Sequence, residues 1–149
     1  MKLNVKILLS RGMTMPAYAT DGSAAVDLRA AIDEGTTVEI APGERALIPT
    51  GIAISPETKD VVAIVAARSG LAIKQGICLS NGIGVIDSDY RGEICVGLHN
   101  TSKVSFTVNR GDRIAQMMFM PVLGAQFIEV TTLDETERGA GGFGSTGVK

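Results

Sequence analysis

The chain is organised around the stretch Gly82-Ile83-Gly84-Val85-Ile86-Asp87-Ser88-Asp89-Tyr90-Arg91-Gly92-Glu93. Its apolar residues alternate, which predicts a short β-hairpin, and its glycines allow the backbone to approach a ligand closely. Two carboxylates and a tyrosine follow within four positions. A plain hairpin tip more often carries Asn-Gly or Asp-Gly and no aromatic residue. The stretch by itself therefore fits a structural turn and a binding site equally well.

Two further stretches carry polar groups suited to an anion. Ser69 is expected to cap a single helical turn over residues 69–74, beside the cation of Arg68. Free backbone N–H groups next to an arginine make a ready anion site, although a helix cap with a surface arginine explains these residues too. Residues 138–147 are glycine-rich and look flexible by composition, yet they hold Arg138, Ser145 and Thr146. This tail lacks the lysine and the following helix of a Walker motif.

Length and composition limit the class of protein. A chain of 149 residues forms one domain with one core, and with 4% aromatic residues and no tryptophan that core must be aliphatic. The formal net charge of −2 argues against bulk nucleic-acid binding, which needs a basic face. A small anionic ligand held by a few arginines remains compatible with this balance.

Cysteine and histidine are scarce. Cys78 and Cys95 lie in apolar, strand-like runs and are expected to be buried free thiols. His99 is the one histidine, so a zinc site with Cys/His spacing is not expected. We expect no membrane span and a cytoplasmic protein, because the N-terminus lacks the apolar segment of a signal peptide and the apolar run 61–67 is too short to cross a bilayer.

Short apolar runs separated by turn residues continue along the chain. Strands are predicted over residues 3–7, 24–30, 38–40, 46–48, 52–54, 61–66, 77–79, 94–98, 104–108, 114–121 and 126–131. About ten short strands with one helical turn predict an all-β barrel or sandwich. Asp27 is unusual within a strand and suggests a bulge or an exposed face, and Gln116 needs hydrogen-bond partners if it is buried.

Taken together, these blocks resemble the trimeric deoxyuridine triphosphatase (dUTPase) family. The resemblance covers nearly the whole chain in five ordered blocks: Ala25-Val26-Asp27-Leu28, Arg68-Ser69-Gly70-Leu71-Ala72, the stretch through Gly92, Arg113-Ile114-Ala115-Gln116, and the block from Arg138. The third and fifth blocks are long and specific. Two positions depart from the family pattern: Ala25 replaces a usual glycine and Ala67 a usual proline, with no loss of chemistry expected.

The resemblance implies a jelly-roll-like homotrimer with active sites shared between subunits. It implies a β core over residues 1–137 and a lid over residues 138–149, within one domain. The expected reaction converts dUTP to dUMP and pyrophosphate, which limits uracil incorporation into DNA and supplies dUMP for thymidylate synthesis. Asp87 would be the general base that activates water for attack on the α-phosphorus, and Asp89 would be structural.

The resemblance also implies the ligand contacts. Asn81, Gly84, Val85 and Ile86 would line the uracil pocket, Tyr90 would pack under the deoxyribose, and Cys95 would border the sugar or base. The phosphates would be held by Arg68, Ser69, Gly70 and Gln116, with Mg²⁺ bridging them and Asp27 reaching the ion through water. In the lid, Phe143 would stack on uracil while Arg138, Gly144, Ser145 and Thr146 grip the β- and γ-phosphates.

Two other functions, each from a different class, are alternatives to dUTP hydrolysis. A dCTP deaminase shares the jelly-roll fold and the trimer but lacks the Phe-containing glycine tail, and it would release ammonia. A non-catalytic trimer that senses nucleotide occupancy would bind dUTP without turning it over.

Overall fold

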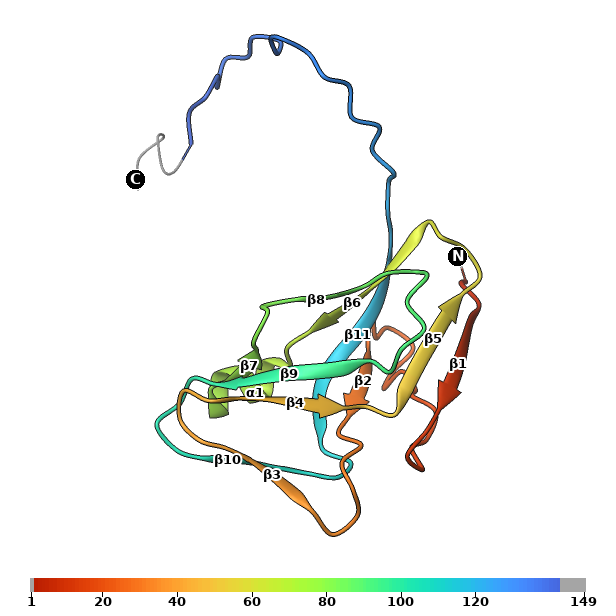
Figure 1. Cartoon of the computed structure of the whole chain (residues 1–149), viewed down its shortest axis with the longest axis vertical. Coiled ribbons are helices and arrows are strands. Elements are labelled where there is room, and N and C mark those ends of the chain that lie inside the picture. The colour runs from red at the N-terminus through yellow and green to blue at the C-terminus, as the bar shows by residue number, and fades with distance from the viewer. Residues whose placement is uncertain (1, 143–149) are drawn as a thin grey trace.

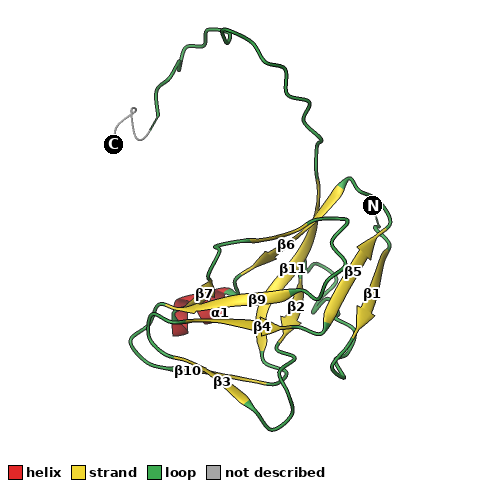
Figure 2. Ribbon diagram, in the orientation of Figure 1, coloured by secondary structure: helices red, strands yellow, loops and turns green. Residues whose placement is uncertain are grey.

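The protein is built almost entirely from short strands. The computed structural model describes residues 2–142, which contain eleven strands and one helix (Figure 1). The strands are β1 (Val5–Leu9), β2 (Val26–Arg29), β3 (Thr37–Ile40), β4 (Arg45–Pro49), β5 (Ile52–Pro56), β6 (Val61–Ala66), β7 (Ile77–Leu79), β8 (Gly84–Ile86), β9 (Cys95–Asn100), β10 (Phe106–Asn109) and β11 (Arg113–Pro121). Helix α1 spans Ser69–Gln75. The all-β, jelly-roll-like class predicted from the sequence is confirmed (Figure 2).

All strand pairs are antiparallel and fall into four small sheets. The largest has the order β2-β11-β6-β8, and the others are β4-β9-β7, β1-β5 and β10-β3. Strand β11 is the longest and joins β2 through its first half and β6 through its second half. It therefore connects segments that are far apart in the sequence.

A β-bulge interrupts the pairing of β11 with β2. The register shifts between Arg113 and Ala115, so Ile114 is the extra residue. Ile114 and Ala115 are consequently both buried, although neighbours along a strand normally face opposite sides. The bulge restores the register that places Gln116 beside Asp27.

The core is aliphatic, as the composition predicted. The fully buried side chains among the described residues include Leu28, Ile40, Ile48, Ile77, Ile94, Leu98 and Ile114, and every buried hydrophobic residue is Val, Leu, Ile, Ala or Met. Burying each of the larger ones contributes roughly 1.5–3 kcal/mol before chain entropy is subtracted. Phe106 and Phe119 pack only at the margin of this core.

The predicted hairpin within residues 82–93 is wrong. Strand β8 pairs with β6 rather than with a strand inside the stretch, and residues 87–94 form irregular turns. The reason is packing: Gly84 lies so close to Val65 that a Cβ added at Gly84 would be 2.9 Å from the Val65 Cβ. The missing side chain lets β8 join the sheet of β6 directly.

The expected cap at Ser69 is also wrong by one residue. The residue preceding the helix is Arg68, with extended backbone, and its carbonyl accepts the first helical bond from the Ala72 N–H at 3.0 Å. Ser69 is the first residue of α1 and is exposed. The helix ends at Gln75 and is capped by Gly76, whose φ of 67° suits a left-handed cap.

The predicted strand over residues 126–131 is not formed. After β11 the described chain runs as an arm, residues 122–142, which is exposed through residue 140 and leaves the body of strands in Figure 1. A strand needs a neighbouring edge, and none of the described strands pairs with this arm. Its apolar side chains stay in solvent, with Leu123 98% and Phe127 95% exposed.

Asn100 is the polar centre of the core, and it generates a stability prediction. Its side-chain amide donates to the carbonyls of Ile40 and Val104, both at 2.8 Å, and its side-chain oxygen accepts from the N–H of Ser102 at 2.9 Å. Asn100→Ala removes the hydrogen bonds of a fully buried side chain, including the one to the Ile40 carbonyl in the core, so we expect a loss of about 2–4 kcal/mol in the free energy of unfolding. Urea denaturation measures it, with the exposed Asn4→Ala as control. A loss equal to that of the control would contradict the assignment.

Candidate functional site

Strand register brings three of the predicted site segments into one row. Gln116 on β11 lies opposite Asp27 on β2 and, on its other side, opposite Ala66 at the end of β6. Cross-strand partners point to the same face of a sheet, so the two polar side chains share the outer, half-buried face. Asp27 therefore occupies the exposed face that its position in a strand suggested, and the bulge lies on the partner strand.

Arg68 and Arg113 both bind the carboxylate of Asp27, and we call these three residues the arginine cluster. The two carboxylate oxygens of Asp27 accept from Arg68 Nε at 3.0 Å and from Arg113 Nη1 at 3.2 Å. Arg68 Nη1 also donates to the Arg113 carbonyl at 3.1 Å. All three side chains keep contact with solvent, since the exposed fractions of Asp27, Arg68 and Arg113 are 28%, 24% and 49%. Two cations held by one carboxylate suit an incoming anion.

Gln116 has found the hydrogen-bond partner that its position required. Its Nε2 donates to the carbonyl of Ala67 at 3.2 Å, next to Arg68. Ser69 and Gly70 are exposed at the start of α1, beside the same cluster. The residues predicted to hold phosphates are thus brought together, and Arg113 is an additional member that was not assigned a role from the sequence. The sequence did hold a signal for Arg113, because this residue is the first of the block that contains Gln116.

Two shallow cavities border the arginine cluster. One of about 320 Å³ is lined by Asp27, Arg29 and Arg113 together with the loop 13–19. The other, of about 310 Å³, is lined by Arg68, Gln75, Thr107 and Arg113, among others. Arg113 faces both, so ligands entering from either side meet a cation.

The predicted base-binding segment lies at the opposite edge of the same sheet. Among the described strands β8 pairs with β6 alone, so its other edge offers main-chain donors and acceptors that the sheet does not use. Asn81 is exposed in the turn before β8, Val85 is 58% exposed, and Ile86 is half-buried. Asp87 and Asp89 follow on the surface.

Tyr90 folds back onto its own loop. Its hydroxyl donates to the carbonyl of Glu93 at 3.2 Å, and the ring is 45% exposed. Gly92 lies against the ring, where an added Cβ would clash with the tyrosine oxygen. A side chain at position 92 would displace the ring, which explains the glycine.

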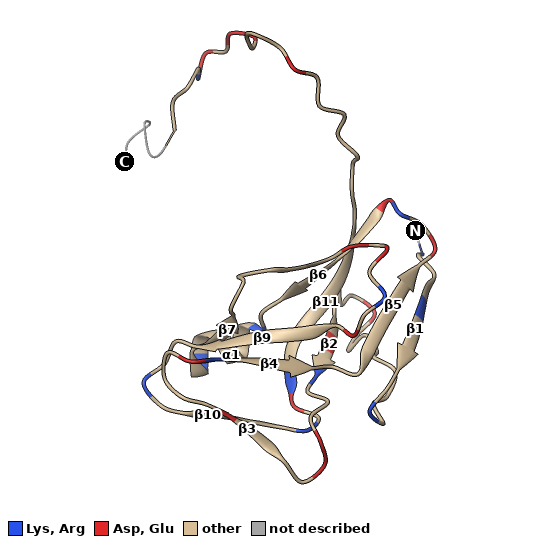
Figure 3. Cartoon of the chain, viewed as in Figure 1, with Lys and Arg blue, Asp and Glu red and all other residues tan. Residues whose placement is uncertain are grey.

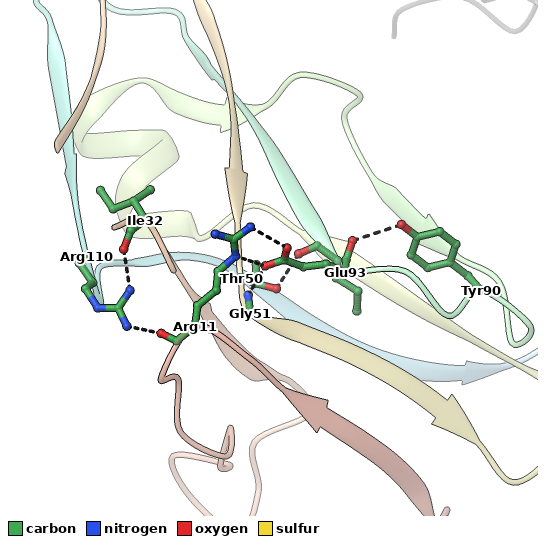
Figure 4. A network of polar contacts seen from close by, with 8 residues as sticks. Arg11, Ile32, Thr50, Gly51, Tyr90, Glu93 and Arg110 are labelled. Atoms are coloured by element: carbon green, nitrogen blue, oxygen red, sulfur yellow. Dashed lines mark hydrogen bonds and ion pairs between the residues drawn. The ribbon is translucent and has the colours of Figure 1, made fainter. Parts of the chain in front are cut away.

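Glu93 ties this loop to two distant segments, as Figure 4 shows. Its carboxylate accepts from Arg11 Nε at 2.9 Å, from Arg11 Nη2 at 3.2 Å and from the N–H of Gly51 at 2.7 Å. The Arg11 hydrogen bond is the main cause that lowers the pKa of Glu93, partial burial opposes it, and the Gly51 N–H adds to the lowering. Neither Arg11 nor Glu93 was singled out from the sequence, because their partnership spans the fold.

The two halves of the predicted site lie apart in one chain. Ile86 pairs with Ala63 of β6, which lies five residues before Arg68 in the sequence, and five extended residues span about 16 Å. The chain then continues away from Arg68: Ser88 donates to the Lys59 carbonyl at 3.4 Å, beyond the start of β6. Asp87 and Arg68 therefore lie towards opposite ends of the sheet.

The cysteines differ from the expectation of two buried thiols. Cys78 is half-buried, but Cys95 is exposed. Strand β9 turns Val96 and Leu98 into the core, which leaves Cys95 on the outer face. Partial burial, followed by the nearby Glu93 carboxylate, raises the pKa of the Cys95 thiol.

Of the predicted tail residues the structure describes only Arg138. It is exposed, and its Nε donates to the Gly141 carbonyl at 2.9 Å within the arm. Phe143, Gly144, Ser145 and Thr146 lie outside the described residues.

Acidic and basic residues are both spread over the body of strands in Figure 3, whereas the described part of the arm carries mostly acidic residues. Within residues 2–142 no three His, Cys, Asp or Glu side chains gather as metal ligands. The same residues include no helix with the length and apolar character needed to span a membrane.

The fold defines an all-β protein, and its arginine cluster has the charge and exposure that suit an anionic ligand. A family model described as dUTPase matches residues 11–147. Deoxyuridine 5'-triphosphate nucleotidohydrolases are similar over most of their length: that of Serratia proteamaculans is 49% identical, covering 98% of this chain and 97% of the relative, and that of Desulfitobacterium hafniense is 56% identical, covering 90% and 87%. The solved structure of a Staphylococcus bacteriophage 80alpha dUTPase mutant with dUpNHpp has a TM-score of 0.85 at 27% identity, covering 99% of both chains. The chain belongs to the dUTPase family.

The lowered pKa of Glu93 generates a pH prediction. A carboxyl whose folded-state pKa lies below its unfolded value, about 4.3, stabilises the fold above that value, and this contribution is lost as the pH falls through the folded-state pKa. Glu93→Gln should therefore lower the free energy of unfolding at pH 7, and the difference from the parent should shrink below about pH 4. Urea denaturation from pH 3 to 8 measures it. A difference independent of pH would contradict the ion pair.

Proposed function

We propose that this chain hydrolyses dUTP to dUMP and pyrophosphate. The observation that carries the proposal is the segment from Gly84 to Asp87: an edge strand with free main-chain groups leads directly to an exposed carboxylate. Similarity to dUTP nucleotidohydrolases over nearly the whole chain supports the same reaction. The cytoplasmic location expected from the sequence belongs to this proposal.

Asp87 acts as the general base. Its carboxylate accepts a proton from a water molecule as the water oxygen attacks the α-phosphorus. The bond from the α-phosphorus to the oxygen bridging to the β-phosphate breaks, and pyrophosphate leaves with that oxygen. The proton is later returned to solvent, so the enzyme is unchanged. The exposure of Asp87 supports this role, since a base that activates water must reach it.

Uracil is recognised by main-chain groups of β8, with Asn81, Gly84, Val85 and Ile86 lining the pocket. The free edge of β8 supports this, because fixed donors and acceptors reject a base with the opposite hydrogen-bond pattern, such as cytosine. Tyr90 packs under the deoxyribose and leaves no room for a 2′-hydroxyl, and Cys95 borders the sugar or base.

The arginine cluster, with Ser69, Gly70 and Gln116, holds the phosphates. Phosphoryl transfer depends mainly on positioning and charge neutralisation, which two adjacent guanidinium groups provide. Asp27 is the one carboxylate of the cluster, so the chain fits Mg²⁺ only where the triphosphate and retained waters supply the other ligands. Asp27 would hold the ion through water, and the bound ion would neutralise phosphate charge.

Residues 138–149 form a lid over the bound nucleotide, as a segment separate from the β core. Phe143 stacks on uracil, while Arg138, Gly144, Ser145 and Thr146 contact the β- and γ-phosphates. The exposure of the arm that leads to this segment supports the proposal, because no described strand pairs with the arm.

The active enzyme is a homotrimer whose sites combine residues of different subunits. The separation of Asp87 from Arg68 supports shared sites, because the base must reach a water at the α-phosphorus while Arg68 holds phosphates of the same molecule. The apolar outer face of the same sheet supports assembly. Its exposed or half-buried side chains are Val62, Ile64, Val85, Met118 and Met120. An arm with exposed Leu123, Phe127 and Leu133 also requires a partner surface.

Pyrophosphate release tests the reaction. The parent is expected to release pyrophosphate from dUTP with Mg²⁺, and far less from dCTP, dTTP or UTP. Asp87→Asn should bind dUTP as the parent does and lower kcat by about 10²- to 10⁴-fold, the usual contribution of a general base. Asp89→Asn, two residues away on the same exposed loop, is the matched control. Unchanged turnover in Asp87→Asn would show that Asp87 is not the general base. Release of ammonia from dCTP without pyrophosphate would indicate a deaminase.

Mixed trimers test the sharing of sites. Asp87→Asn and Arg68→Ala chains should each be nearly inactive, and co-refolding them one to one should restore about a quarter of the parent activity, because each site draws two chains at random. The double variant co-refolded with Asp87→Asn is the control, since no site then contains both residues intact. Light scattering reports the trimer. An inactive mixture of normal size would contradict shared sites.

A further inference from the structure

Arg11 adopts a backbone conformation that side chains seldom tolerate. Its φ is 52°, and it is the one non-glycine residue with positive φ among the described residues. Such a conformation costs roughly 1–2 kcal/mol for a residue with a Cβ, so it persists only where surrounding contacts hold it. Here the Arg11 carbonyl accepts from the Arg110 guanidinium, which also donates to the Ile32 carbonyl at 2.6 Å (Figure 4).

This turn directs the Arg11 side chain at Glu93. Both carboxylate oxygens are engaged, at 2.9 and 3.2 Å, in the two-point geometry that fixes direction as well as distance. The third donor is the N–H of Gly51 at 2.7 Å. Gly51 has a φ of 69°, and an added Cβ would lie 2.8 Å from the Ser10 carbonyl, so the segments before Arg11 and around Gly51 are in close contact.

The main chain beside Glu93 is held as firmly. Thr50, which is fully buried, donates from Oγ1 to the Ile94 carbonyl at 2.6 Å, and the Ile94 N–H donates to the Ile52 carbonyl at 2.7 Å. The Glu93 carbonyl is the acceptor for the Tyr90 hydroxyl at 3.2 Å. The side chain that Arg11 holds and the carbonyl that accepts from Tyr90 thus belong to the same residue, Glu93, so the ion pair and the ring contact are linked through one stretch of backbone.

The energy of the ion pair by itself does not explain this arrangement. The Arg11 and Glu93 side chains are 43% and 27% exposed, and pairs with this much solvent contribute about 0–1 kcal/mol to stability. The backbone strain at Arg11 costs at least as much free energy as the Arg11–Glu93 pair contributes. The pair is therefore better explained by a role in placing the loop that carries Glu93 than by a role in stability.

We propose that Glu93, held by Arg11, is a positioning residue for Tyr90 and thereby sets how tightly the sugar end of the nucleotide pocket closes. This inference rests on the proposed function, which places Tyr90 under the deoxyribose. Releasing Glu93 frees the ring, which weakens the contact with the sugar and opens room for a 2′-hydroxyl. The reacting atoms at Asp87 are untouched.

The first test follows the ring without any substrate. The chain has two tyrosines and no tryptophan, so Tyr18→Phe leaves Tyr90 as the one fluorescent reporter. In this background, Glu93→Gln keeps the size of the side chain and an oxygen for the Gly51 N–H but removes the charge. We expect acrylamide to quench the Tyr90 emission more strongly and the emission anisotropy to fall. Quenching and anisotropy equal to those of Tyr18→Phe overturn the proposal.

The second test divides binding from chemistry. For Glu93→Gln we expect KM for dUTP to rise roughly three- to tenfold with kcat within about twofold of the parent, and UTP to be rejected less strongly relative to dUTP. Arg11→Gln should give the same changes, and the double variant should be no worse than either alone, since both remove one interaction. A fall in kcat with unchanged KM and unchanged UTP discrimination overturns the proposal.

Glu57→Gln is the matched control. Glu57 is an exposed carboxylate that also accepts from one main-chain N–H and one side chain, both of Asn4, at 3.0 and 2.8 Å. It should change neither the quenching of Tyr90 nor KM, and an equal effect of this variant would overturn the assignment to Glu93. If the parent itself fails to hydrolyse dUTP, the proposed function fails, while the fluorescence test still decides whether Glu93 holds the ring.

Discussion

The register of β11 is the constraint on which the rest of this molecule depends. One strand of nine residues pairs with β2 at one end and β6 at the other, and a single-residue slip would turn its buried face to solvent. The bulge at Ile114 absorbs the extra residue that would otherwise misalign Gln116 with Asp27. Core packing and the alignment of the polar row are thus decided by the same hydrogen-bond ladder.

The sheet built on β11 explains where the candidate site residues lie. Its order, β2-β11-β6-β8, places the arginine cluster near one end and the open edge of β8 near the other. A single chain consequently carries the two halves of the proposed nucleotide site at separate places on the sheet. The exposed apolar arm and the apolar outer face of the sheet fit the proposed homotrimer, in which a second chain would cover apolar surface left open in the first.

The loop between β8 and β9 lacks regular structure and is fixed by contacts from elsewhere. Glu93 anchors it to the turn at Arg11 and to Gly51, while Ser88 contacts Lys59. Loops that carry functional groups need such external support, because their own backbone offers few internal hydrogen bonds. The strained backbone at Arg11 is understandable in these terms.

Much of this protein was accessible from sequence because the information is local. Alternating apolar residues indicated ten of the eleven strands and the aliphatic core, turn residues indicated the boundaries, and the motif blocks identified the family and its candidate residues. The tertiary structure alone decided that β8 joins β6 instead of forming a hairpin, that residues 126–131 have no partner strand in the described chain, and that Cys95 faces outward. It also revealed Arg113 within the cluster and the Arg11–Glu93 pair. Each of these depends on which distant segments meet, and pairing between residues 82 apart, as for Arg11 and Glu93, leaves no periodic signal in the sequence.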